Sequence, residues 1–250
     1  MYPSSVRDRA RALRAQGRTW SEVSRLLGVN RSTLRSWESA PELSDCPRPA
    51  VERALPHDER LAQAYAALLG YYLGDGCISR FRRSTVLRVS CDNLYPGIID
   101  DVEALMLSVH PHRSVFRVPA PGCTVVQQGW RHWPCLFPQH GQGRKHERSI
   151  GLEPWQLAVV AEHPGPLLRG LFHSDGCRVR NWARQPVAGE LKRYDYPRWQ
   201  FVNASADIRE LCCWALDLVD VAWRQSAPRT ISVSRREAVA SLDALIGLKR

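Results

Sequence analysis

Residues 68–76 read LLGYYLGDG, and residues 168–176 repeat the pattern as LRGLFHSDG. In both copies an apolar stretch carries a glycine at its third position, a small residue near its end, and then Asp-Gly followed by cysteine. The two aspartates, Asp75 and Asp175, are 175 − 75 = 100 positions apart. Self-similarity at this spacing predicts that the chain contains two related halves.

Each copy is expected to end a helix. From residue 61 onward, apolar residues recur at the i, i+3, i+4, i+7 spacing of a helix that leads into the first copy. Gly70 and Gly170 would let two such helices approach closely, as small residues do in other tight helix pairs. Gly76 and Gly176 are expected to adopt the left-handed conformation that commonly ends a helix.

Two converging aspartates have a chemical consequence. Each helix C-terminus carries about half a negative charge, and like charges that close raise a pKa or require a cation. Magnesium binds carboxylate oxygens together with substrate phosphates. Paired aspartates on a basic protein therefore predict a metal site at which a phosphodiester is cut.

Three further segments flank the two copies in a matching way. Residues 87–93 (LRVSCDN) precede a helix, residues 198–205 (RWQFVNAS) precede a longer one, and the basic segment 143–150 (GRKHERSI) comes before the second copy. Together with the two nonapeptides, these flanks resemble the single-chain, two-motif form of the LAGLIDADG homing endonucleases. The resemblance covers roughly residues 61–250.

The resemblance implies an α+β fold in which two pseudo-symmetric repeats, about 61–165 and 166–250, form a saddle of antiparallel sheets along the DNA major groove. It implies that Asp75 and Asp175 are catalytic ligands of Mg²⁺ or Mn²⁺, which would activate water and stabilise the leaving oxygen on each strand. Lys145 is expected near the scissile phosphate as the third catalytic residue, with Arg148 as the second choice. The second half offers no equivalent lysine by sequence, and Arg235 is its only candidate.

The two copies depart from the family pattern in places. The sixth motif position, often acidic, is Leu73 in one copy and His173 in the other. A packed or hydrogen-bonded histidine is the expected role of His173, rather than a metal ligand. Arg169 stands where a small residue is usual, so it is expected to point outward or to loosen the helix pair.

In the family, side chains on one sheet face read the bases. Strand alternation in this sequence proposes a set of polar residues for that face, because arginine suits guanine edges and glutamine suits adenine edges. Each could equally be an ordinary solvated surface residue. The candidates are Arg88, Ser90, Arg117, Gln127, Arg178, Arg180 and Gln200.

Composition favours the same partner. The 250 residues carry a formal net charge of +10, and all but three of the 35 basic residues are arginine. Arginine is the preferred residue for bidentate phosphate and guanine contacts, so double-stranded DNA is the expected partner. An arginine bias from GC-rich coding is the alternative. No stretch resembles a signal peptide or a membrane span, so we expect a cytoplasmic, nucleoid-associated protein.

The first 40 residues resemble a homeodomain-like helix-turn-helix. Helical spacing from Val6 is followed by a break at Gly17, a second helix over 20–27, a Gly-Val turn, and Asn30 as the cap of a third helix. Leu34 and Trp37 would face the core. The residues expected in the major groove are Arg31, Ser32, Arg35 and Ser36. The alternative is a helical unit that only contacts other proteins.

The chain is thus expected to comprise a helix-turn-helix domain (1–40), a proline-rich linker (41–60) and an endonuclease-like domain (61–250) that acts as a monomer. The first hypothesis is a Mg²⁺-dependent, sequence-specific homing endonuclease that cuts both DNA strands. The second is a non-cleaving transcriptional regulator on the same fold. An intron-RNA maturase has no positive support in the sequence, and an intein is disfavoured because no splice-junction block is present.

Overall fold

The computed structural model of the chain describes residues 4–38, 58–81, 84–187 and 189–250. The chain divides into two compact units, Met1–Cys46 and Pro47–Arg250. Most of the predicted linker lies outside the described residues. Among the described residues of the second unit, the first helix begins at Glu59, two residues before the boundary expected from the sequence.

The described part of the first unit, residues 4–38, forms three short helices, α1 (Ser4–Ala15), α2 (Trp20–Leu27) and α3 (Arg31–Glu38). A capping box between Thr19 and Glu22 starts α2, and Gly28 ends it in the left-handed conformation with a φ of 64°. Leu34 and Trp37 are buried in the small core, as the sequence predicts.

The second unit contains two halves with the same order of main elements. The first half comprises α5 (Glu59–Leu73), β1 (Gly76–Arg80), β2 (Thr85–Asp92), α6 (Pro96–Val109), β3 (Val115–Ala120), β4 (Cys123–Gly129), the short helix α7 (Trp133–Leu136), the 3₁₀ turn η3 (Lys145–Glu147) and α8 (Pro154–Glu162). The second half comprises α9 (Pro164–Asp175), β5 (Gly176–Val187), β6 (Glu190–Val202), α10 (Ala206–Leu218), β7 (Arg224–Ala227), β8 (Thr230–Val233) and α11 (Arg236–Ile246). These elements confirm the predicted α+β class.

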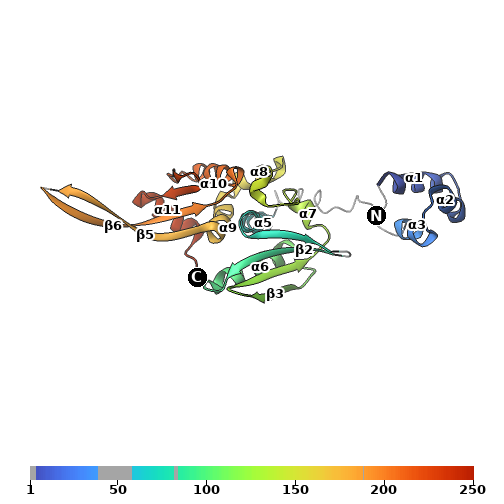
Figure 1. Cartoon of the computed structure of the whole chain (residues 1–250), viewed down its shortest axis with the longest axis horizontal. Coiled ribbons are helices and arrows are strands. Elements are labelled where there is room, and N and C mark those ends of the chain that lie inside the picture. Colours follow the sequence, from blue (N-terminus) through green and yellow to red (C-terminus); the bar gives the residue numbers. More distant parts are fainter. Residues whose placement is uncertain (1–3, 39–57, 82–83, 188) are drawn as a thin grey trace. The chain divides into compact units, whose positions relative to one another are not determined.

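Each half builds one antiparallel four-stranded sheet with the same topology, β1-β2-β4-β3 in the first and β5-β6-β8-β7 in the second. Helices pack on one face of each sheet, where Leu87 and Val89 in one half and Trp199 and Phe201 in the other are completely or almost completely buried (Figure 1). We call the opposite face of each sheet its open face. One continuous core joins the two halves through α5 and α9.

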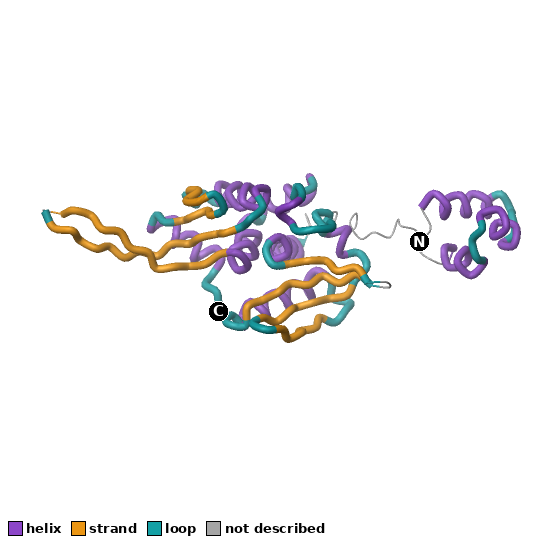
Figure 2. Tube along the Cα trace, viewed as in Figure 1, coloured by secondary structure: helices purple, strands orange, loops and turns teal. Residues whose placement is uncertain are grey.

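The second half departs from the first in its hairpin. β5 and β6 pair over their whole length, from Gly176 opposite Phe201 to Val187 opposite Glu190, whereas β6 pairs with β8 only from Trp199 onward. The two strands therefore run past the sheet as a ribbon (Figure 2). In this region the sequence predicts strands only over residues 177–182 and 199–203, because the ribbon's exposed side chains do not alternate between a core face and a solvent face.

The sequence predicts a single long helix over residues 207–223, but the observed helix is shorter. α10 ends at Leu218, and Asp220 adopts a left-handed φ of 53° that turns the chain into strand β7. Trp223, which fits the helical spacing, instead donates its indole N–H to the Asp217 carboxylate at 2.7 Å. Among the described residues, no helix combines the length and apolar character that a membrane crossing requires.

Candidate functional site

The site is built on the contact between α5 and α9. A Cβ added to Gly70 would lie 2.4 Å from the Leu167 carbonyl oxygen, and one added to Gly170 would lie 2.3 Å from the Ala67 carbonyl oxygen. Real Cβ atoms do not approach backbone oxygen this closely, so the two backbones can meet only because both positions are glycine. The predicted close pairing of the motif helices is confirmed.

The helix ends meet as well. A Cβ on Gly74 would lie 2.3 Å from Ser174 Cβ and 3.4 Å from Asp175 Oδ2. The helix pair therefore brings the end of each motif, and with it Asp75 and Asp175, to one place. This juxtaposition was the central expectation from the sequence.

The role predicted for the motif-ending glycines is wrong. Gly176 is extended, with φ −97° and ψ 155°, and Gly76 is not among the glycines with positive φ. Glycine is required there for space instead. A Cβ would lie 2.4 Å from Tyr72 Cα at Gly76 and 2.5 Å from the Phe172 carbonyl oxygen at Gly176, because each strand starts tightly against its own helix.

The two carboxylates lie together where their surroundings are partly desolvated, although Asp75 is exposed at the surface and Asp175 is half-buried. Burial, and then the neighbouring charge of Asp75, raises the pKa of Asp175 to about 6. Asn203 opposes this shift by donating its side-chain N–H to Asp175 Oδ2 at 2.6 Å. Burial also raises the pKa of Asp75, against the opposing charges of Lys145 and Lys249. A bound cation would relieve this repulsion.

Lys145 lies at the C-terminal end of α5, beside the paired aspartates. Its Nζ donates to the Leu73 and Gly74 carbonyl oxygens at 3.0 and 2.6 Å, at the negative end of helix α5. Burial lowers the pKa of Lys145 to about 8, although Asp175 and Asp75 oppose the shift. Arg148, the second choice, donates to the Gln139 carbonyl oxygen instead.

Lys249 is a second lysine at the site that sequence reasoning missed. Its Nζ donates to the Ser174 carbonyl oxygen at 3.3 Å, and burial lowers its pKa against the charge of Asp75. Ser174 is the counterpart of Gly74, since 174 − 74 = 100, so the two lysines contact corresponding carbonyls. Arg235, the sequence candidate, is exposed at the start of α11. The chain has only three lysines, and this rarity could have drawn attention to Lys249.

The C-terminal segment that carries Lys249 is held by His173. The buried imidazole donates from Nε2 to the Gly247 carbonyl oxygen at 3.3 Å, and its Nδ1 lies 3.1 Å from the Tyr71 hydroxyl oxygen. His173 is therefore a packed, hydrogen-bonded residue, as expected. Arg169 points outward and forms an ion pair with Asp101 at 2.6 Å.

The residues present fit a hard cation that completes its shell with water and phosphate. Among the described residues, no three His, Cys, Asp or Glu side chains are grouped to hold a metal alone. Two carboxylates are nevertheless a common protein share of a magnesium shell. Ser174 Oγ is buried without a hydrogen-bond partner, and a cavity of about 80 Å³ lies between Asp75, Ser174 and Lys249.

The open faces hold four of the seven predicted DNA-reading residues. Arg88 lies opposite Gln127, and Ser90 two positions along β2 shares their face, which points away from the buried Leu87 and Val89. Gln200 lies opposite Cys177 on the open face of the second sheet.

The other three predicted residues are on the wrong face. Arg117 lies opposite buried Val126 and forms ion pairs with Asp100 and Glu103 of α6. Arg178 lies opposite buried Trp199 and pairs with Asp243 of α11. Arg180 follows two positions later on the same face, and its nearest carboxylate is Asp195, 3.8 Å away. Acidic residues on the covering helices draw two of these arginines inward, which strand alternation alone does not reveal.

Two arginines that the sequence did not single out lie on the second open face. Arg198 is opposite Val179, and Arg224 is opposite Ser232, which shares its face with Gln200. In the first unit, Arg31, Ser32 and Arg35 are exposed on α3, and the side chain of Ser36 lies outside what the structure describes. The Ser32 backbone N–H donates to the Asn30 side chain at 3.2 Å, so Asn30 caps this helix as predicted.

Comparison with known proteins identifies the fold. No family model and no curated protein matches this sequence. Among solved structures, a variant of I-DmoI in complex with its target DNA and magnesium has a TM-score of 0.50 and 11% identity, covering 76% of this chain and 98% of that one. I-DmoI in complex with DNA and manganese gives the same TM-score and identity, covering 75% and 98%. The N-terminal LAGLIDADG domain of DUF199/WhiA has a TM-score of 0.48 and 13% identity, covering 81% and 93%. The chain therefore has the fold of the LAGLIDADG homing endonucleases, with its two motif helices at the centre.

Proposed function

We propose that this protein is a sequence-specific DNA endonuclease that hydrolyses a phosphodiester on each strand of its target with the help of a divalent cation. One observation carries the proposal: Asp75 and Asp175 lie side by side at the meeting ends of α5 and α9, with a lysine beside each helix end. A protein that only bound DNA would gain nothing from holding two mutually repelling carboxylates side by side on a DNA-binding fold.

The two aspartates would hold Mg²⁺ or Mn²⁺ together with oxygens of the bound DNA. The cation would supply Lewis-acid activation of water and charge stabilisation at the leaving oxygen. The I-DmoI structures with DNA and magnesium or manganese are consistent with such a requirement. The raised pKa of Asp175 sets a condition, because this side chain must lose its proton before it can act as a ligand.

Lys145 and Lys249 would act on the phosphate rather than on the cation. Each ammonium group is held by carbonyl oxygens beside one aspartate, where it would stabilise the charge that develops during cleavage. With a pKa of about 8, Lys145 can also hold or release a proton near neutral pH. The two lysines would serve one strand each.

The open faces would contact the DNA. Arg88, Gln127, Gln200 and Arg198 offer donors and acceptors for base edges, and the net charge of +10 would supply phosphate affinity that falls steeply with salt. The three-helix unit would extend recognition through the exposed Arg31 and Arg35 of α3.

A non-cleaving DNA-binding regulator is the second candidate. The separate three-helix unit favours it, because a helix that can enter a major groove is sufficient for regulation without chemistry. This candidate predicts tight DNA binding without cleavage in any divalent cation.

The test begins with the full chain and a randomised duplex library, selected in Ca²⁺. The recovered duplex is then transferred to Mg²⁺ and to Mn²⁺, and its ends are mapped. Cleavage of both strands with a short overhang is the expected result. Tight, salt-sensitive binding with no nick in either metal would reject the endonuclease and support the regulator.

A further inference from the structure

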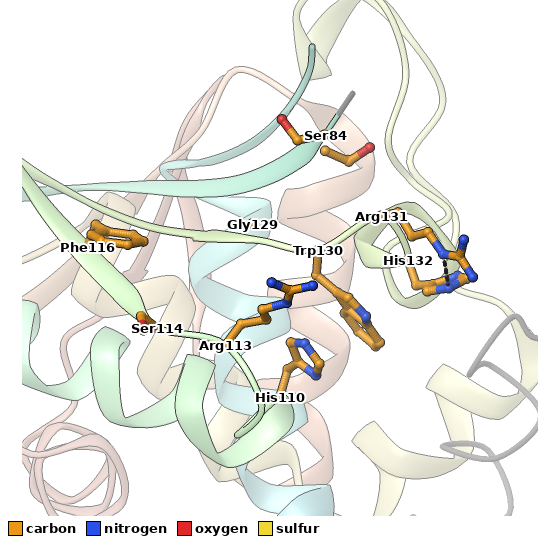
Figure 3. A pocket seen from close by; sticks show the side chains of 10 residues that line it. Ser84, His110, Arg113, Ser114, Phe116, Gly129, Trp130, Arg131 and His132 are labelled. Atoms are coloured by element: carbon orange, nitrogen blue, oxygen red, sulfur yellow. Dashed lines mark hydrogen bonds between the residues drawn. The ribbon is translucent and has the colours of Figure 1, made fainter. Parts of the chain in front are cut away.

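A second cavity lies at the end of the first sheet, away from the paired aspartates. It has a volume of about 750 Å³ and lies where β4 ends and the α6–β3 turn reaches the sheet (Figure 3). Its charged and aromatic lining residues are two arginines, two histidines, a phenylalanine and a tryptophan, namely His110, Arg113, Phe116, Trp130, Arg131 and His132. No carboxylate is among the described residues that line it.

Stacking and hydrogen bonds hold the residues that line this cavity in place. His110 is only 9% exposed, and its ring stacks on Trp130 with a centroid distance of 4.1 Å and an interplanar angle of 13°. The fully buried Gln128 donates to the His110 and Arg113 carbonyl oxygens at 2.9 and 2.8 Å. These bonds fix the turn that carries Arg113, so the cavity does not depend on a loose loop.

Two polar groups that line this cavity lack a partner within the described part of the chain. His110 Nε2 is buried without a hydrogen bond. Arg113 forms no ion pair with any described residue, and in Figure 3 its guanidinium lies beside Trp130 and above His110. A buried, unsatisfied polar atom costs free energy unless a ligand or water satisfies it. Beside it, the exposed Arg113 guanidinium faces no carboxylate among the described lining residues, which favours an anion as the ligand.

The aromatic groups narrow the class of anion. Phe116 is 59% exposed across the cavity from Trp130, and Phe116 shares the open face of the first sheet with Gln127. The Phe116 ring can stack on a base, and the Arg113 guanidinium can bind two oxygens of a phosphate. Together they suit a base joined to a phosphate better than an inorganic anion.

We propose that this cavity binds a nucleotide, with its phosphate on Arg113 and His110 and its base against Phe116. The same chemistry can come from the DNA strand that runs off the first open face or from a free nucleoside monophosphate. The DNA source rests on the proposed function, whereas the free-nucleotide source does not. If the nucleotide belongs to the DNA, the cavity would extend the length of DNA that the protein contacts. If it is free, the cavity would make DNA binding respond to the concentration of the nucleoside monophosphate.

The test uses the full chain and titration calorimetry with deoxyadenosine monophosphate, inorganic phosphate and deoxyadenosine. We expect the monophosphate to bind most tightly and Arg113→Ala to weaken it about tenfold or more, since hydrogen bonds to charged groups contribute ~1.5–3 kcal/mol. Arg236→Ala, which removes an exposed arginine of α11 outside the cavity, should leave binding unchanged. Phe116→Ala should reduce the preference for the monophosphate over phosphate.

A second arm separates the two sources. The affinity of wild type, Arg113→Ala and Arg236→Ala for the selected duplex is measured with and without the monophosphate. A DNA source predicts that Arg113→Ala alone weakens duplex binding and that the monophosphate competes. A free-nucleotide source predicts titratable monophosphate binding without competition. If the monophosphate does not bind and Arg113→Ala matches Arg236→Ala on DNA, the proposal is overturned, whether or not the protein cleaves DNA.

Discussion

At the scale of single residues, Lys249 has the most informative position. It contacts Ser174 as Lys145 contacts the equivalent Gly74, but it comes from the last residues of the chain rather than from the segment before the second motif. We predict that Lys249→Met and Lys145→Met each slow cleavage about 10–100-fold, and that they do so on opposite strands. Strand-resolved single-turnover assays at saturating protein measure this, with Lys192→Met as the control for the loss of a lysine. Equal slowing of both strands by each variant would contradict it.

The raised pKa of Asp175 predicts a pH dependence. Below about pH 6 this carboxylate is protonated and cannot bind a cation, so the cleavage rate should rise as pH increases through about 6. Asn203 donates to the ionised carboxylate and lowers its pKa, so Asn203→Ala should shift the midpoint to higher pH. Rates at a fixed, subsaturating Mg²⁺ concentration across about pH 5 to 7.5 test both statements, because saturating cation would displace the proton and lower the apparent midpoint. A midpoint that stays in place in the variant would argue against Asp175 as the titrating group.

The same residue predicts an effect on stability. Because the pKa of Asp175 is raised from 3.8 to about 6 on folding, the folded state binds this proton more tightly than the unfolded state does. The resulting penalty is absent below about pH 4 and complete above about pH 6. Without metal, Asp175→Asn should therefore raise the melting temperature by roughly 2–8 °C at pH 7 and very little at pH 4. Glu210→Gln, at an exposed position of α10, should leave the melting temperature unchanged at both pH values.

At the scale of elements, the helix pair α5–α9 determines whether the site forms. Gly170→Ala would push a methyl group into the Ala67 carbonyl of α5, so we predict a loss of roughly 1–3 kcal/mol in unfolding free energy and a large loss of cleavage. Gly165→Ala is the matched control in the same helix, because its Cβ would lie an ordinary 3.5 Å from Leu245. Chemical denaturation and cleavage assays of both variants give the comparison. Similar losses in the two would show that helix propensity or fraying is responsible, rather than the close approach.

The elements that the sequence predicts well are those whose pattern is set by burial. The apolar spacing before Leu68 identifies α5, and the glycines at 70 and 170 identify its partner. The ribbon of β5 and β6 escapes prediction because its far half packs against nothing that would impose alternation. Arg117 and Arg178 were assigned to the open face because a sequence does not show which acids lie across from a strand.

In the site, too, some residues can be predicted from the sequence and others cannot. Asp75 and Asp175 lie within the motifs, and Lys145 lies in the basic segment 143–150 that precedes the second motif, so local patterns are enough to find all three. Lys249 and Asn203 reach the site only through the tertiary fold, one from the C-terminal segment held by His173 and the other from the end of β6. Contacts of this kind depend on how distant elements pack, and no local spacing encodes them.

At the scale of the whole molecule, one chain supplies both halves of the site, which is why a monomer remains the prediction. The separate three-helix unit should contribute affinity but no chemistry. We predict that the double variant Arg31→Ala, Arg35→Ala weakens duplex binding and lowers its salt dependence by about two phosphate contacts, while the cleavage rate at saturation is unchanged. Arg25→Ala on α2 is the control. A change in the saturated rate would mean that the unit acts on the catalytic domain directly.

The proposed endonuclease activity depends on the carboxylates of Asp75 and Asp175 acting together as one cation-dependent centre. The most direct measurement is strand-resolved cleavage of the selected duplex in Mg²⁺ by wild type, Asp75→Asn, Asp175→Asn and Glu210→Gln, with binding measured in parallel in Ca²⁺. We predict that each aspartate variant loses cleavage of both strands by about 10³-fold or more, while binding changes little and Glu210→Gln behaves as wild type. Cleavage that persists in either aspartate variant, or a wild-type protein that binds its site in Mg²⁺ and never nicks it, would contradict the account.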